Sequence, residues 1–439
     1  MSVFIGYPSF MAYQMMKGKK GNNDGFPSIP GMIARYSALG LTNEQMAENP
    51  VWKDLTGNRH DLQMKNFAWK EGSGISDIYP GALVFDGVDD YGACDNFPIL
   101  TKEKGYTVVA LRQWITRGEI AKGLVSNVKN WLKDGAFLLE YRNIQADHLN
   151  KPISFGAIGS EMDLPHILTY QTSKSYNGVS ITTGNFEGTD VLHVGKLAPI
   201  NVGTCINAAI WELVILDHDA TEEELTKIKD YFVKTYPWLF FDQAWTVTGK
   251  TNEDEDRATI ANITGNGNDL VLSNFSFAEG SGYNEQGEYA GYLVTDGVDD
   301  EVRSSSFLFG NDFTVVGEWE FLQEDSNVLA GFNKNYTYFV LYNYISGVNV
   351  YVKNSKGTSI RNTKTLKAVT SEGLIYTDFN SEQKVELADK VEANLPLYIA
   401  YNGNNYTKMA FKNLAIYPRI LSKDDCIKAY NYLQSLKAK

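Results

Sequence analysis

The feature that most constrains this chain is an internal repeat. Asp54–Gly74 reads DLTGNRHDLQMKNFAWKEGSG, and Asn262–Gly282 reads NITGNGNDLVLSNFSFAEGSG. Three further pairs of segments match in the same order: Ala34–Glu44 with Ala244–Asp254, Leu83–Ala93 with Leu293–Arg303, and Ala208–Leu225 with Met409–Cys426. Because matching segments in a fixed order are the signature of repeated structural units, we predict two duplicated domains, 33–240 and 241–439, with residues 1–32 preceding both.

Composition favours β structure in these domains. At 439 residues the chain is longer than one typical domain, in agreement with a duplication. Aromatic residues make up 13% of it, and many of its 38 glycines stand beside Asn or Asp, as in β-rich proteins with many turns. Short β-branched or aromatic segments bounded by turn residues predict strands: Tyr106–Ile115, Phe313–Phe321, Tyr338–Asn343, Val348–Asn354 and Leu397–Gly403.

Each unit is expected to end in one helix. Thr221 and Glu224 form a capping box in the first unit, and Ser422 and Asp425 occupy the capping positions in the second. Many strands in two layers followed by a helix predict an all-β protein. We therefore expect two tandem jelly-roll β-sandwiches, each closed by a short C-terminal helix, with an extended N-terminal arm.

The order of the motifs DLTGN, FDGVDDY and ELVILDHDATEEEL, with strands between the last two, resembles the laminin-G-like and concanavalin A-like lectin/glucanase superfamily. That superfamily includes lectins, adhesion modules, glucanases and structural domains, so the resemblance implies an architecture rather than an activity. The segment Ala244–Phe277 is also similar to virion structural proteins of crAss-like phages that infect gut Bacteroidales. This second resemblance implies a virion protein that is assembled in the bacterial cytoplasm.

The repeated GVDD motif concentrates carboxylates in a short window. It comprises Asp86, Gly87, Asp89 and Asp90 in the first unit, and Asp296, Gly297, Asp299 and Asp300 in the second. The first Asp-Gly of each copy is typical of a tight turn in which the carboxylate bonds its own backbone. The following Asp-Asp pair offers oxygen ligands for calcium. A structural turn and a calcium site are both kept as interpretations, and no other cofactor is expected.

Glu318 and Glu320 are the best candidates for a hydrolase. Residues two apart on a strand point to the same face, roughly 6.5–7 Å apart, which is compatible with a glycosidase pair. The glucanases of the resembled superfamily carry a third acid in a motif similar to E-x-D-x-x-E, and this strand lacks it. The first unit has Leu111 and Gln113 at the aligned positions. Solvated carboxylates are therefore favoured, and we expect no enzyme.

The remaining motifs give weaker indications of a functional site. Thr248–Asn252 (TGKTN) lacks the first glycine of a phosphate loop, and Glu253–Asp256 is expected to be a solvated acidic loop, with a divalent-cation site as the alternative. The 5 histidines have no metal-site spacing, and the 3 cysteines are expected to be free thiols. A net charge of −13 argues against nucleic acid as a partner, and no apolar run approaches the ~20 residues that span a bilayer.

The N-terminal arm is too apolar for a free tail. Its anchor residues are Phe4, Tyr7, Phe10 and Tyr13, which are followed by the polar connector KGKKGNNDG. The charges come after the apolar stretch, so no secretion signal is expected. The arm is expected to dock on a partner or on its own sandwich.

These observations favour a non-enzymatic phage virion surface protein, such as a head fibre, decoration or tail-associated component. Its expected partners are other virion proteins through the arm, further copies of itself, and host surface glycans. A bacterial carbohydrate-binding or adhesion protein and a glycoside hydrolase are the alternatives. No cluster of aromatic residues in the sequence indicates a sugar-binding site.

Overall fold

The computed structural model describes residues 24–100, 105–116, 122–127, 138–141, 164, 166–171, 175–176, 179–180, 189–196, 205–322, 328–331, 339–344, 347–352, 358–361, 365–384, 393–401 and 406–438. The chain divides into two compact units, Met1–Thr235 and Tyr236–Lys439. The division falls slightly before the expected boundary at 240/241. The 3-10 helix η2 (Pro237–Leu239) goes with the second unit, where the carbonyl of Trp238 accepts a hydrogen bond from the Tyr417 hydroxyl at 3.0 Å.

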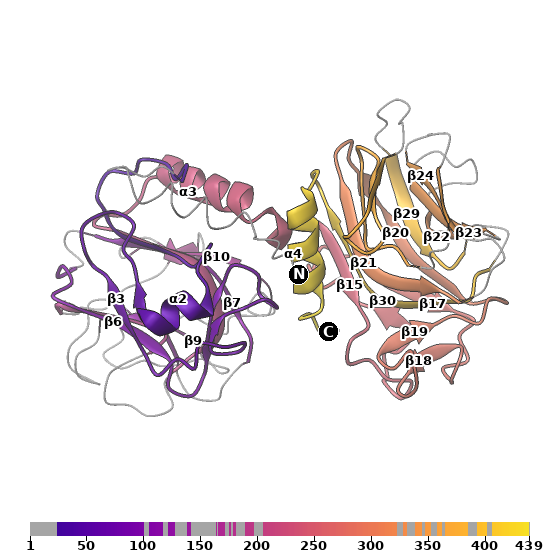
Figure 1. The fold of residues 1–439 in the computed structure, drawn as a ribbon, viewed down its shortest axis with the longest axis horizontal. Helices are drawn as coiled ribbons and strands as arrows, with labels where there is room; N and C mark the ends of the chain where they lie inside the picture. The colour runs from indigo at the N-terminus through magenta and orange to yellow at the C-terminus, as the bar shows by residue number, and fades with distance from the viewer. Residues whose placement is uncertain are drawn as a thin grey trace, which may run out of the picture. The chain divides into compact units, whose positions relative to one another are not determined.

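Both units are antiparallel β-sandwiches with few helices, which confirms the predicted all-β fold (Figure 1). In the first unit, sheet 1a has the order β12 (Val179–Ser180), β11 (Ser175–Tyr176), β10 (His166–Gln171), β7 (Thr107–Trp114), β14 (Asn207–Leu216), β5 (Leu83–Asp86), β4 (Gly74–Ile75), with β1 (Met32–Ser37) also paired to β14. Sheet 1b has the order β2 (Val51–Trp52), β3 (Leu62–Lys65), β6 (Tyr91–Asp95), β13 (Val191–Val194), β8 (Lys122–Ser126), β9 (Leu138–Tyr141).

The second unit repeats this plan. Sheet 2a has the order β18 (Gly282–Asn284), β19 (Tyr292–Val294), β30 (Met409–Tyr417), β21 (Thr314–Phe321), β26 (Ala368–Thr370), β27 (Leu374–Tyr376), β28 (Glu382–Lys384), with β15 (Gln243–Thr246) also paired to β30. Sheet 2b has the order β16 (Thr259–Ile260), β17 (Leu270–Ser273), β20 (Glu301–Phe309), β29 (Ala393–Ile399), β22 (Val328–Gly331), β23 (Phe339–Tyr344), β24 (Gly347–Val352), β25 (Thr358–Arg361).

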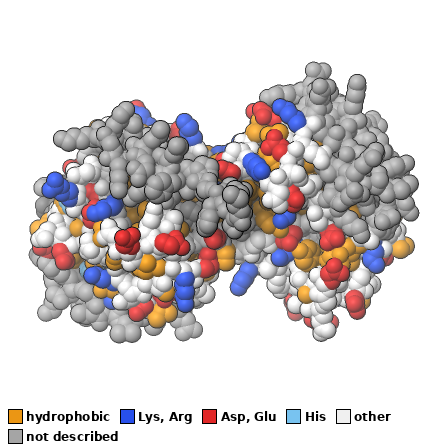
Figure 2. Space-filling model, viewed as in Figure 1, with side chains coloured by type: hydrophobic (Ala, Val, Ile, Leu, Met, Phe, Trp, Pro, Cys, Tyr) orange, Lys and Arg blue, Asp and Glu red, His pale blue; other side chains and the backbone are white. Residues whose placement is uncertain are grey.

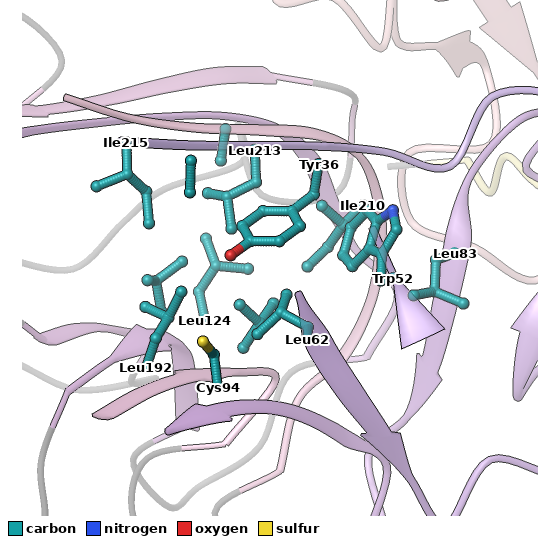
Figure 3. Packing of buried hydrophobic residues seen from close by; sticks show 14 of the residues in the cluster. Tyr36, Trp52, Leu62, Leu83, Cys94, Leu124, Leu192, Ile210, Leu213 and Ile215 are labelled. Atoms are coloured by element: carbon teal, nitrogen blue, oxygen red, sulfur yellow. The ribbon is translucent and has the colours of Figure 1, made fainter. Parts of the chain in front are cut away.

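Each core lies between the two sheets of its unit. In the first unit, Tyr36 and Leu213 of sheet 1a meet Leu62 and Leu192 of sheet 1b, and all four side chains are fully buried (Figure 3). Strand β3 alternates buried and exposed residues along LQMK, and β17 does the same along LVLS. Such alternation places one face of a strand in the core, where each large apolar side chain contributes about 1.5–3 kcal/mol.

The duplication extends to an irregularity in the central strands. The register of β14 against β7 skips Trp211, and the register of β30 against β21 skips Lys412 at the aligned position. Each strand therefore carries one extra residue, a β-bulge, at the same place.

The helices follow from local capping. In α3 (Glu222–Thr235) the Thr221 hydroxyl accepts a bond from the Glu224 N–H at 3.2 Å, and in α4 (Lys423–Leu433) Ser422 caps Asp425 in the same way at 3.2 Å. A further helix, α2 (Asn43–Glu48), was not predicted. It is short, but it has a complete capping box and buries Met46.

The expected end of one strand was wrong. Strand β29 was predicted over Leu397–Gly403, but it runs from Ala393 to Ile399, because Ala400 has φ +63° and ends it. Residues 24–32 were assigned to the arm, for which docking on its own sandwich was one of two alternatives. In this segment Phe26 is only 5% exposed, and its ring lies 4.7 Å from that of Tyr231 in α3. This segment therefore packs on the first unit.

The anchors Phe4, Tyr7, Phe10 and Tyr13 lie outside the described residues. On the face that Figure 2 shows, acidic and basic side chains are interspersed over the described parts of both units. Of the helices in the described ranges, none is long and apolar enough to cross a bilayer.

Candidate functional site

The GVDD motif of the second unit forms a hydrogen-bonded turn. Asp296 Oδ1 accepts the N–H groups of Val298 at 2.7 Å and of Asp299 at 3.3 Å. Asp300, 1% exposed, accepts the Asp296 N–H at 2.7 Å and the Ser281 hydroxyl at 3.0 Å. Gly297, with φ +78°, supplies the left-handed conformation that the turn needs. The two carboxylates thus close the turn on its own backbone.

The first unit has the same turn. Asp86 Oδ1 accepts the N–H groups of Val88 at 2.8 Å and of Asp89 at 3.3 Å, and Asp90 Oδ2 accepts the Asp86 N–H at 3.0 Å. Gly87 has φ +80°, and a Cβ there would lie 2.8 Å from the Cβ of Asn207. The amide of Asn66 donates to the Asp89 carbonyl at 2.9 Å, as Asn274 does to Asp299 at 2.9 Å.

The carboxylates of each turn also bring oxygens together. One oxygen from each of Asp86, Asp89 and Asp90, and likewise from Asp296, Asp299 and Asp300, lies within 4.8 Å of the others. In each turn, the first and last carboxylates already accept backbone N–H groups, and burial raises the pKa of Asp90 and of Asp300 to about 6. These contacts account for the turn, and calcium binding at Asp89, Asp90, Asp299 and Asp300 stays an alternative.

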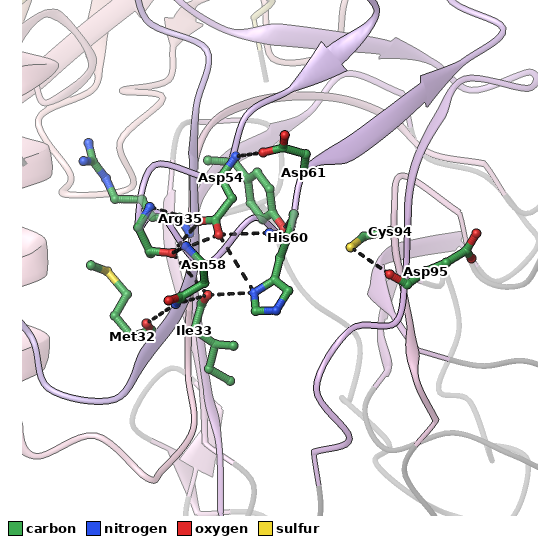
Figure 4. Close-up of polar contacts among 11 residues, drawn as sticks. Met32, Ile33, Arg35, Asp54, Asn58, His60, Asp61, Cys94 and Asp95 are labelled. Atoms are coloured by element: carbon green, nitrogen blue, oxygen red, sulfur yellow. Dashed lines mark hydrogen bonds and ion pairs between the residues drawn. The ribbon is translucent and has the colours of Figure 1, made fainter. Parts of the chain in front are cut away.

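The DLTGN and NITGN motifs also form matching loops. Asp54 accepts the N–H groups of Arg35 at 3.2 Å, Thr56 at 3.0 Å and His60 at 3.1 Å (Figure 4). Asn262 takes the same place in the second unit and accepts the Ala244 N–H at 3.3 Å. The residues shared by the two repeats therefore build the fold, so functional differences must be sought where the units diverge.

The remaining loop candidates have structural partners. Asp254 accepts both the N–H of Thr251, at 2.9 Å, and its hydroxyl, at 2.8 Å. Lys250, the lysine of TGKTN, has a side chain that is 4% exposed and forms an ion pair with Asp256 at 2.7 Å. Two carboxylates of the acidic run, Asp254 and Asp256, and the lysine of TGKTN are therefore engaged in contacts within the loop.

Glu318 and Glu320 lie half-buried on β21 and are also engaged. Glu318 accepts the Tyr292 hydroxyl at 2.6 Å and lies 3.5 Å from the Lys412 ammonium. Burial and the hydrogen bond to Glu318 raise the pKa of Tyr430 in α4. Burial, with Glu320 as a further cause, raises the pKa of Tyr289. The two carboxylates therefore connect α4, β19 and β30 to β21.

An open tyrosine-bearing face lies on sheet 2b. Antiparallel pairing sets Val271 of β17, Arg303 of β20 and Tyr398 of β29 in one row across three strands. Val271 is 51% exposed, Arg303 is exposed, and Tyr398 is half-exposed. The Arg303 guanidinium lies 5.0 Å from the centroid of the Tyr398 ring, close enough for a cation–π contact.

Two further tyrosines extend this row. Tyr401 lies 5.8 Å from Tyr398 with the rings at 65°, and it stacks on Tyr406 at 4.8 Å. Within the described ranges the hydroxyls of Tyr398, Tyr401 and Tyr406 have no hydrogen-bond partner. Burial raises the pKa of Tyr401, so its hydroxyl stays protonated near neutral pH. We call the set Val271, Arg303, Tyr398, Tyr401 and Tyr406 the tyrosine face.

The first unit has no such face at the aligned positions. The same cross-strand row there holds Gln63, Ala93 and His193. His193 is only 6% exposed, and burial together with Lys196 lowers its pKa to about 4. The tyrosine face is therefore a feature of the second unit.

The sequence analysis missed this face. Its members come from separate segments, and only the register of β17, β20 and β29 brings them together. The one local signal was the order Leu397, Tyr398, Ile399, in which the two apolar neighbours are buried and the tyrosine points outward.

No family model and no curated protein matches the chain. A Trypanosoma rangeli sialidase mutant displaying trans-sialidase activity is 13% identical over 47% of this chain, with a TM-score of 0.34, and the match spans 34% of that sialidase. Another structure of that sialidase is 11% identical over 61% of this chain and 48% of its own, with a TM-score of 0.31. The botulinum neurotoxin serotype D binding domain is 9% identical over 87% of this chain and 97% of its own, with a TM-score of 0.37. These similarities assign neither a family nor a function.

Proposed function

We propose that the chain is a non-enzymatic carbohydrate-binding protein whose ligand contacts lie on the tyrosine face. The observation that carries this proposal is the set of three partly exposed tyrosines, on and next to β29, whose hydroxyls have no hydrogen-bond partner among the described residues. A tyrosine ring offers a rigid apolar surface against which the C–H face of a sugar ring can stack. Its hydroxyl can exchange hydrogen bonds with sugar hydroxyls at low entropic cost.

The geometry of the rings favours a ligand segment of one or two sugar residues. Tyr398 and Tyr401 meet at 65°, so they form a corner rather than a flat platform for a long polymer. One or two sugar residues fit such a corner, and the affinity of a single face is expected to be weak. Many copies on one particle would raise the effective affinity by about 10²–10⁴.

A phage particle is the proposed setting for these copies. The chain would be a head fibre, decoration or tail-associated component, held to other virion proteins through Phe4, Tyr7, Phe10 and Tyr13. The apolar arm and the resemblance of Ala244–Phe277 to virion proteins support this role. Deleting residues 1–20 should abolish incorporation into particles, and normal incorporation of the truncated chain would refute the anchoring role.

We propose that the chain has no glycosidase activity because of the contacts made by the candidate carboxylates Glu318 and Glu320. A glycosidase needs one carboxyl with a raised pKa and one free carboxylate on either side of the scissile bond. Glu318 instead contacts Tyr292 and Lys412, and the carboxyls with pKa raised to about 6, Asp90 and Asp300, are buried in turns.

A glycan array followed by affinity titration tests the proposal. Tyr398→Ala and Tyr401→Ala should weaken binding at least tenfold, whereas the matched control Tyr289→Ala, in the turn between β18 and β19 of the same unit, should bind normally. Equal binding by all variants, or no binding to any glycan, would refute the site. Release of reducing ends from a bound glycan would refute the non-enzymatic assignment.

A further inference from the structure

We infer that the tyrosine face prefers anionic sugars and that Arg303 provides this preference. The inference rests on the proposed function and adds the chemical class of the ligand. Arg303 is exposed, and the ring of Tyr398 lies 5.0 Å from its guanidinium. Stacking restricts the side chain before a ligand arrives, so less conformational entropy is lost on binding.

The charge of Arg303 is available to a ligand. Among the residues that the structure describes, no carboxylate forms an ion pair with Arg303. Many other cations are already paired, for example Lys53 with Asp61 at 2.6 Å and Lys250 with Asp256 at 2.7 Å. The guanidinium keeps its N–H groups for an incoming oxyanion, and its planar fork matches a carboxylate or a sulfate in two parallel hydrogen bonds.

The neighbours of Arg303 supply the rest of a sugar site. Across the strands lie Val271 and Tyr398, which offer apolar surface. Along β20, Ser305 is on the same face and donates to the Asn268 side chain at 2.6 Å. Glu301 is also on this face and is half-exposed. One acidic side chain two residues away leaves the local charge close to neutral, so selectivity would come from the directed guanidinium rather than from a broad basic field.

The net charge of the chain sharpens this inference. A net charge of −13 gives no long-range attraction that would recruit an acidic glycan. Recognition of an anionic sugar then needs a short-range contact at a defined point. Arg303 provides that contact beside Tyr398, whose hydroxyl has no hydrogen-bond partner among the described residues.

Matched pairs of polymers test the inference. The probes are polygalacturonate and its methyl ester, in which esterification replaces the charged carboxylate by a neutral methyl ester, together with dextran sulfate and dextran. The wild-type chain should bind at least one charged polymer about tenfold more tightly than its neutral partner. The two pairs distinguish a carboxylate from a sulfate as the oxyanion.

Two variants connect the preference to one side chain. Arg303→Gln should reduce the charged-to-neutral ratio to about 1 while binding of the neutral probe stays within about twofold. Arg59→Gln, which removes an exposed arginine from the first unit, should keep the preference. Equal affinity for charged and neutral probes in the wild type, or a preference that survives Arg303→Gln, would overturn the inference alone. Failure to bind any probe or any arrayed glycan would remove the proposed function with it.

Discussion

The ion pair of Arg35 and Glu212 offers the most demanding test of how the first unit is held together. The two side chains are 1% and 0% exposed, and the Arg35 guanidinium donates to the Glu212 carboxylate at 3.3 and 3.1 Å. It also contacts Tyr231 at 2.9 Å and Asp24 at 2.5 Å. Although burial alone would lower the pKa of Arg35, Glu212 raises it above its ordinary value. The pair links β1, β14, α3 and the segment that begins at Asp24.

Arg35→Ala removes the guanidinium that pairs with the buried Glu212 carboxylate, and it should therefore lower the free energy of unfolding by about 3–5 kcal/mol. Glu212→Asn should cost less, because Asp24 still pairs with the Arg35 guanidinium. Strand register shifts the sequence match by one residue here: Arg35 pairs with Val214 as Ala244 pairs with Ala415, so the second unit has Ala244 in place of Arg35 and Asn413 in place of Glu212. The double variant Arg35→Ala/Glu212→Asn copies that uncharged arrangement, so it should cost less than the two single changes together, with a coupling energy of about 2–3 kcal/mol.

Urea denaturation of the wild type, both single variants and the double variant measures this coupling. Hydrogen–deuterium exchange should show the faster opening in β1 and β14, while β15 and β30 of the unchanged unit serve as the internal control. Single-variant costs that add to within about 0.5 kcal/mol in the double variant would refute the reasoning, because additivity means that the two charges do not depend on each other.

Three further outcomes concern the repeated turns. Burial raises the pKa of Asp300 to about 6, so the folded state binds more protons than the unfolded state between about pH 4 and 6. The contribution of this carboxyl to the free energy of unfolding is therefore full below about pH 4 and is lost as the pH rises through 6. The stability of Asp300→Asn relative to the wild type should increase by about 1–3 kcal/mol between pH 4 and 7; a constant difference would contradict this assignment. Asn274 has φ +68° and donates to the Asp299 carbonyl, so Asn274→Ala should lower the melting temperature more than Asn274→Gly, and equal losses would argue against backbone strain. Millimolar calcium should leave the melting temperature unchanged, whereas a rise that Asp299→Asn abolishes would establish a calcium site.

The fold was predictable where the sequence carries its own hydrogen bonds. The Asp296 turn and the Ser422 cap each satisfy backbone groups two or three residues away, and such contacts leave short, recognisable motifs. The duplication then extended each motif to a second copy. The sandwich architecture follows from these motifs and from the alternation of apolar residues.

The tyrosine face was not predictable by the same reasoning. Val271, Arg303 and Tyr398 meet only because β17, β20 and β29 pair in one register, and sequence order does not specify which strands become neighbours. The engagement of Glu318 was hidden for the same reason, since Lys412 and Tyr292 belong to other strands. The sequence identified the candidate carboxylates but not the side chains on other strands that contact them.

The bulge shared by β14 and β30 has a historical consequence. An insertion at the same point of both copies is most simply inherited from one ancestral unit that already contained it. At this bulge the first unit has Trp211, whose indole N–H donates to the Pro80 carbonyl at 3.0 Å, and the second unit has Lys412, whose ammonium lies 3.5 Å from Glu318. The first unit has Leu111 at the position of Glu318, so a chimaera that moved Lys412 alone would leave the lysine without this carboxylate. The bulged residue and its partner would therefore have to be transplanted together.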